Sequence, residues 1–169
     1  MKQKPMGLSM LASISVAPDS ANPGPLDDLQ YITGNIDLLV DDDDILRLGQ
    51  FAGALLLLPS IDVLADGVAR MRSGQKTVEV ILIGDTSSLW LIQKKIDGRT
   101  GLIAAHKGAE TRPVLPEEFD AACERAIVEF FVWLCRARPR STWDSSATQI
   151  ANAVKSVWPK IAQATPTGR

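Results

Sequence analysis

Carboxylates are the most concentrated reactive groups in this sequence, and their densest cluster is the run Asp41–Asp44. Neighbouring carboxylates can hold Mg²⁺ or Ca²⁺, but a calcium loop spaces its oxygen ligands at alternating positions around a glycine and ends on a distant glutamate. Here Ile45 follows four consecutive aspartates directly. We therefore expect no metal at this run, and we interpret it as helix-capping and solvent-exposed charge.

Histidine and cysteine offer little further chemistry. The single histidine, His106, ends a predicted strand, so a multi-histidine metal site or a histidine acid–base pair is excluded and we expect a strand-edge or surface residue. The thiols Cys123 and Cys135 lie in one predicted helix, roughly 18 Å apart along its axis. This separation rules out a disulfide bond between them. We interpret both as small core residues in a reducing compartment.

Motifs that carry catalysis are absent from the sequence. It contains no Gly-x-Ser-x-Gly elbow, no phosphate-binding loop ending in Lys-Ser/Thr, no dinucleotide fingerprint and no Cys-x-x-Cys pair. The set of nucleophile, base and oxyanion donor that an active site requires cannot be filled from these residues. We therefore expect a protein that is not an enzyme and that uses no cofactor.

Charge is distributed unevenly along the chain. Residues 1–66 carry ten aspartates, no glutamate and three basic side chains, a formal charge of −7, whereas residues 67–169 carry fifteen basic and ten acidic side chains, a formal charge of +5. A negative patch disfavours nucleic acid and attracts a basic protein partner. The residues that we expect to form this partner-binding surface are Asp41, Asp42, Asp43, Asp44, Asp62 and Asp66.

A small basic cluster favours the opposite kind of partner, nucleic acid. Arg136, Arg138 and Arg140 lie close to Trp143 in the sequence, and arginine can bind phosphate while tryptophan stacks on a base. The sequence pI is near 5.4, however, and basic side chains also stabilise the C-terminal end of a helix. We interpret the cluster as helix-terminal charge and expect no nucleic-acid partner.

Size and composition indicate one globular domain. The chain has 169 residues, of which 46% are hydrophobic and 22% charged. We expect a single domain over residues 1–169, with flexible ends at 1–7 and 164–169. Its apolar stretch Phe51–Leu58 stops at Pro59, short of the roughly 20 apolar residues that span a membrane. Lys2 and Lys4 leave an export signal as an alternative, but the alternation that follows favours a strand and a cytoplasmic protein.

Hydrophobic periodicity predicts an α+β fold. Period-two alternation predicts strands at 8–17, 31–40, 77–83, 89–96 and 102–106, the last three as an antiparallel meander. Helical spacing predicts a helix from Ile45 to Pro59, its continuation from Ser60 to Ser73, and helices at 115–138 and 145–162. The order β-β-α(α)-β-β-β-α-α predicts an antiparallel sheet of about five strands with helices packed on one face.

Two of these segments carry a resemblance. The strand Val78–Asp85 is followed by the strand Leu89–Ile92, which leads to the turn Asp97-Gly98. Within the β-β-α-β-β-β-α plan of about residues 30–137, they resemble bacterial immunity proteins of polymorphic and contact-dependent toxin systems. The resemblance implies a small cytosolic binder that blocks a toxin domain, and it assigns no toxin-binding residue by position. We therefore expect an immunity-type inhibitor that uses its acidic surface against a basic toxin domain.

A structural or chaperone-like interaction module is the alternative. The stretches Phe51–Leu58 and Phe130–Trp133 are apolar on more than one face, and an exposed apolar helix face can form a dimer or a docking groove. A size measurement in solution separates the two functions, and the sequence leaves the oligomeric state open.

Overall fold

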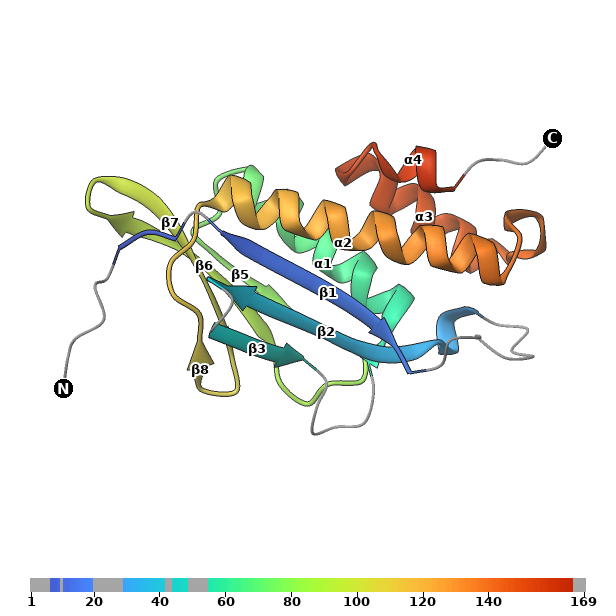
Figure 1. Cartoon of the computed structure of the whole chain (residues 1–169), viewed down its shortest axis with the longest axis horizontal. Helices are drawn as coiled ribbons and strands as arrows, with labels where there is room; N and C mark the ends of the chain where they lie inside the picture. Colours follow the sequence, from blue (N-terminus) through green and yellow to red (C-terminus); the bar gives the residue numbers. More distant parts are fainter. Residues whose placement is uncertain (1–6, 10, 20–28, 42–43, 49–54, 166–169) are drawn as a thin grey trace.

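The computed structural model describes residues 7–9, 11–19, 29–41, 44–48 and 55–165 (Figure 1). Its elements follow one another as β1 (Ala12–Pro18), η1 (Leu29–Tyr31), β2 (Thr33–Val40), β3 (Asp44–Leu48), β4 (Leu55–Leu56), α1 (Leu57–Arg72), β5 (Thr77–Val80), β6 (Leu89–Ile96), β7 (Arg99–His106), β8 (Ala109–Glu110), α2 (Pro116–Ala137), η2 (Arg140–Thr142), α3 (Ser145–Val157) and α4 (Ile161–Ala164). The expected α+β class is confirmed.

The first sheet has the strand order β1-β2-β3. The short strand β4 also pairs with β2, and all of these pairs are antiparallel. Ile14, Leu38 and Leu46 are register partners across its three main strands, and all three are buried on one face. β1 and β2 come unusually close at Gly34, where a Cβ atom would lie 2.3 Å from the carbonyl oxygen of Ala17. Glycine at this position lets the two strands pair beside α1.

The second sheet is the antiparallel meander β5-β6-β7-β8, which confirms the meander predicted from the sequence. Asp97 and Gly98 form the two-residue turn between β6 and β7, with φ values of 50° and 79°. Asp-Gly suits this turn because both central residues adopt positive φ. Lys107 and Gly108 adopt the same backbone region between β7 and β8.

Backbone hydrogen bonds join the two sheets at two places. Ser9, just before β1, donates to the carbonyl of Pro113 at 2.8 Å, while the neighbouring Val114 exchanges two hydrogen bonds with Leu102 of β7. Leu56 of β4 donates to the carbonyl of Ile83 at 2.9 Å, just beyond β5. The structure therefore has two sheets tied together, where the sequence predicted one sheet of about five strands.

The helices cover the sheets in two layers (Figure 1). α1 packs on β5 and α2 along β1, whereas α3 lies on α1 and α4 on α2. Gly67 of α1 allows close contact with the second sheet, because a Cβ atom there would lie 2.6 Å from Cγ2 of Val80. The layers are connected by Asp120 of α2, which accepts a hydrogen bond from Arg72 of α1 at 2.7 Å and one from the indole of Trp158 at 2.8 Å.

The helix predicted from Ile45 to Pro59 is wrong. Asp44–Leu48 is strand β3, residues 49–54 lie outside the described part, and α1 begins at Leu57. Apolar residues in this segment satisfy helical spacing, but the short alternation in which Leu46 and Leu48 are buried and Arg47 is exposed also satisfies a strand. The segment forms a strand because it pairs with β2. Pro59 lies in the first turn of α1, where proline is tolerated.

Candidate functional site

The predicted acidic residues separate into a hairpin group and a helix group. Asp41 follows β2 with φ 55°, Asp44 begins β3, and Asp42 and Asp43 lie outside the described residues. Asp41 and Asp44 therefore lie where β2 ends and β3 begins, and neither caps a helix, which corrects the capping interpretation for these two residues. Aspartate tolerates this left-handed backbone better than most residues.

The carboxylate of Asp41 is already bound within the protein. The hydroxyl of Ser9 donates to its Oδ1 at 2.5 Å, and Nη1 of Arg112 lies 3.3 Å from its Oδ2. These contacts fix the turn against the segment that joins the two sheets. Asp41 therefore has a structural role that the sequence pattern did not indicate, because both of its partners are distant along the chain.

Asp62 and Asp66 lie one turn apart on α1, at a distance from the hairpin. α1 starts beside the beginning of β2, since Leu57 N–H donates to the carbonyl of Ile32 at 2.9 Å, whereas Asp41 follows the end of β2. A strand of that length spans roughly 26 Å. The two groups also bind different partners, since Asp66 pairs with Arg70 and Asp41 with Arg112.

The helix pair is a local concentration of negative charge. Burial raises the pKa of Asp62 above its usual value, and the neighbouring carboxylate of Asp66 raises it further. Asp66 forms an ion pair with Arg70 at 3.0 Å, and Nη2 of Arg70 also donates to the carbonyl of Glu79 on β5 at 2.9 Å. The acidic side of α1 therefore adjoins the free edge of the second sheet.

Large apolar side chains are exposed beside this edge, one on the outer face of β6 and two in the segment that follows β5. Ile81 is 62% exposed, Trp90 is 40% exposed and Ile83 is 37% exposed. Glu79 is the register partner of Trp90, and Ile81 directly follows the last residue of β5, Val80. We call these three apolar residues the Trp90 face.

The opposite face of the same strands explains why the Trp90 face points outward. Val78, Val80 and Leu82 are buried beneath α1, and so are Leu89 and Leu91 on either side of Trp90. Successive side chains of a strand point to opposite faces, so the residues between them are turned away from the helices. The alternation Leu89-Trp90-Leu91 is the sequence signal that places Trp90 on the face opposite to the two leucines.

His106 belongs to a buried polar cluster that the sequence did not reveal. Its Nε2 lies 2.8 Å from Oδ2 of Asp85, and the two side chains are 3% and 0% exposed. Nζ of Lys107 lies 3.3 Å from Oδ1 of the same carboxylate, which also accepts from the amide of Ser87. His106 does end a strand, as expected, but the expectation that it lies at the surface is wrong. The cluster fastens the loop after β5 to the turn after β7.

Both thiols are suppressed as nucleophiles. Burial raises the pKa of Cys123 well above its usual value, and the nearby Asp120 adds to the effect. Burial also raises the pKa of the half-buried Cys135, opposed by Arg140. A thiol with a raised pKa holds little reactive thiolate at neutral pH. These observations agree with the interpretation of small packing residues.

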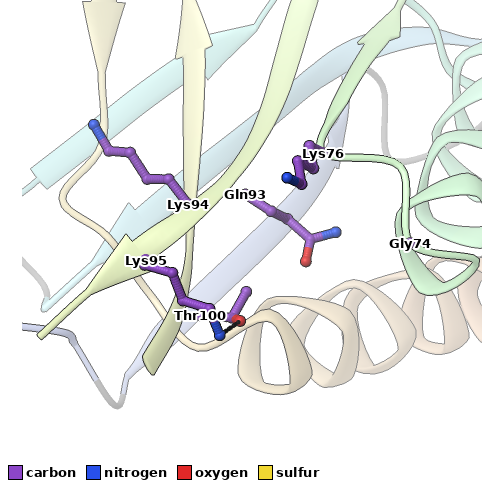
Figure 2. Close-up of a pocket in the computed structure, with 6 residues that line it drawn as sticks. All are labelled: Gly74, Lys76, Gln93, Lys94, Lys95 and Thr100. Carbon is purple, nitrogen blue, oxygen red and sulfur yellow. Dashed lines mark hydrogen bonds between the residues drawn. The ribbon is translucent and has the colours of Figure 1, made fainter. Parts of the chain in front are cut away.

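An open pocket of about 420 Å³ lies on the other face of the second sheet, beyond the end of α1. Figure 2 shows the side chains around it, which come from the end of α1, β6 and β7. Nζ of Lys95 donates to the hydroxyl of Thr100 at 3.3 Å. The lining residues are Gly74, Lys76, Gln93, Lys94, Lys95 and Thr100.

Comparison with known proteins found no match. No family model matches the chain, and neither a curated protein nor a solved structure is significantly similar to it. Among the described side chains, no group of three or more histidine, cysteine, aspartate or glutamate residues is placed to hold a metal ion. Within the same residues, no helix combines the length and apolar character needed to cross a membrane.

Proposed function

We propose that this chain is a non-catalytic protein-binding protein, an immunity-type inhibitor that neutralises a cognate bacterial toxin. The observation that supports a protein partner best is the Trp90 face, three exposed large apolar side chains that lie on β6 and in the segment just after β5. Exposed apolar side chains that gather on one surface are typical of interaction sites. Tryptophan is also enriched among the residues that dominate binding energy.

Acidic groups adjoin the Trp90 face along one side. Glu79 lies directly across the strand pair from Trp90, and Asp62 and Asp66 follow on α1 beyond the β5 edge. Arg70 pairs with Asp66 and donates to the backbone carbonyl of Glu79. The group thus contains three carboxylates and one guanidinium. An apolar centre with an acidic border fits a partner whose own apolar contact is bordered by lysine and arginine.

The contact surface in this proposal keeps Asp62 and Asp66 and adds the Trp90 face. Asp41 is assigned to the fold, because its carboxylate already binds Ser9 and Arg112. Charge reversal of Asp42, Asp43 and Asp44 tests the hairpin separately. Unchanged affinity for the partner would remove the hairpin from the contact surface, whereas a loss would place it there.

Growth protection tests the proposed function directly. A bacterial host would express the toxin domain that is captured by pull-down with this chain, together with the wild-type chain, Ile81→Asp or Leu11→Asp. Leu11 is the matched control for Ile81, because the two side chains are 63% and 62% exposed and lie just before β1 and just after β5. We expect the wild type and Leu11→Asp to restore growth and Ile81→Asp to fail while remaining folded. Equal protection by all three chains would contradict the assigned surface.

A dimeric interaction module is distinguished by mass in solution. Phe130 and Phe131 are buried, so the Phe130–Trp133 stretch presents its two phenylalanines to the core. Leu57 and Leu58 are buried as well. A dimer that is broken by Ile81→Asp would show that the Trp90 face binds a second copy, and the inhibitor proposal would then lose its contact surface.

A further inference from the structure

The pocket beyond the end of α1 collects positive charge through the register of the second sheet. Gln93 N–H donates to the carbonyl of Lys76 at 2.7 Å, so these two residues stand opposite each other. Lys95 is two residues further along β6, on the face that Gln93 occupies, and is the register partner of Thr100. Diagonal neighbours on one sheet face lie about 7–8 Å apart at their Cα atoms. The side chains of Lys76 and Lys95 therefore both line this pocket.

Lys94 borders this pocket differently. It alternates with Gln93 and Lys95 along β6, so it belongs to the outer face of the sheet, with Trp90. Figure 2 shows its ammonium group directed away from the side chains of Gln93, Lys95 and Thr100. The same strand thus carries two adjacent lysines of equal charge, one facing the pocket and one facing away.

The charge of the pocket lysines is not neutralised within the described residues. No ion pair there joins Lys76 or Lys95 to a carboxylate, and the one hydrogen bond of the Lys95 ammonium goes to the neutral hydroxyl of Thr100. Asp120 and Glu117 line the adjoining pocket, which shares Gln93 and Thr100 with the first. Asp120 is already bound by an arginine and an indole.

The remaining walls hold the pocket open. The side-chain amide of Gln93 donates to the carbonyl of Met71 at 3.0 Å and to that of Gln75 at 3.3 Å, which fixes the end of α1 to β6. A Cβ atom at Gly74 would meet nothing within 4 Å, so space is free at that wall. The hydroxyl of Thr100 accepts from Lys95 and keeps its own proton to donate.

We propose that this pocket binds a small multivalent oxyanion, through the ammonium groups of Lys76 and Lys95 and the hydroxyl of Thr100. Lysine serves as a compact point charge for phosphate, and its ammonium also binds carboxylate. The ligand is therefore a small molecule bearing several phosphoryl or carboxylate groups. This site is independent of the proposed function, because it lies on the opposite face of the sheet from Trp90.

Calorimetric titration at constant ionic strength tests the site, with inorganic pyrophosphate and citrate as probes. The variants are Lys76→Gln/Lys95→Gln, which removes two positive charges, and the control Lys94→Gln, which removes one positive charge next to the pocket. We expect saturable binding by the wild-type chain, a loss of roughly tenfold or more in affinity in the double variant, and a change of less than about twofold in the control. Binding of pyrophosphate alone identifies a phosphoryl ligand, and tighter binding of citrate identifies a carboxylate ligand.

Two results would overturn the site. One is the absence of saturable binding of both probes at millimolar concentration by the folded wild-type chain. The other is an equal loss of affinity in Lys94→Gln, because a general surface charge would then account for the binding. Circular dichroism of each variant confirms that the chain remains folded. Neither result bears on the Trp90 face.

Discussion

Nε2 of His106 lies 2.8 Å from Oδ2 of Asp85, and both side chains are almost completely withdrawn from solvent. A buried carboxylate is costly without partners, so the histidine is part of what makes burial of Asp85 tolerable. Without His106, Asp85 keeps Lys107 and the amide of Ser87 but loses one hydrogen-bond partner of its buried carboxylate. We therefore expect His106→Ala to lower the free energy of unfolding by about 1–3 kcal/mol, as measured by urea denaturation.

Asp85→Asn and Asp97→Asn complete this test. Asp85→Asn keeps the shape and part of the hydrogen bonding, so we expect a loss of about 1–3 kcal/mol. Asp97 is an exposed turn residue with φ 50°, a backbone conformation that asparagine also adopts, and its replacement should change stability little. Unfolding free energies of His106→Ala and Asp97→Asn that agree with each other would show that the cluster does not stabilise the fold.

The strands and helices with regular periodicity could be predicted from the sequence. The Asp97-Gly98 turn, the meander β5-β6-β7 and the long helix α2 each have a strong local signal, and the structure has all of them. The segment around β3 could not be predicted in the same way. Its short apolar pattern fits both a helix and a strand, and the deciding interaction is pairing with β2, which periodicity does not contain.

The stability of the chain should depend on pH through Asp62. Burial and Asp66 raise the pKa of Asp62 above 3.8, so the folded state holds its proton to higher pH than the unfolded state. The Asp62 contribution is thus present below pH 3.8 and is lost as the pH rises through the raised pKa. We expect Asp62→Asn to be more stable than wild type at neutral pH by at most about 0.5 kcal/mol, with the difference disappearing in acid.

An NMR titration of the Asp62 carboxyl checks the cause. In Asp66→Asn one source of repulsion is removed, so the pKa of Asp62 should fall toward its usual value without reaching it, because burial remains the larger effect. Titration of Asp62 in the wild-type chain at or below its usual pKa would refute this account of the pH dependence.

The two cysteines should differ in their reaction with a thiol reagent. Cys123 is fully buried and its pKa is raised strongly, so we expect it to react when the chain unfolds. Cys135 is half-buried, and it should react in the folded chain more slowly than free cysteine. Rates measured with Cys123→Ala and Cys135→Ala assign each thiol. Rapid labelling of Cys123 under native conditions would contradict its packing in the core.

Part of the proposed contact surface could be predicted from the sequence. Asp62 and Asp66 stand one helical turn apart, which their spacing shows directly. Their position beside β5 depends on Arg70 reaching the carbonyl of Glu79, a contact between separate elements. The sequence could not show that Asp41 has a structural role either, because its partners Ser9 and Arg112 are distant along the chain and meet it only in the folded protein.

Affinity for the partner captured by pull-down tests the Trp90 face most directly. Calorimetric titration would compare the wild-type chain with Trp90→Ala and with Leu11→Ala, an exposed apolar residue outside the proposed surface. We expect Trp90→Ala to weaken binding about tenfold or more and Leu11→Ala to leave it within about twofold, with both chains folded. Affinity of folded Trp90→Ala within about twofold of wild type would contradict the central claim.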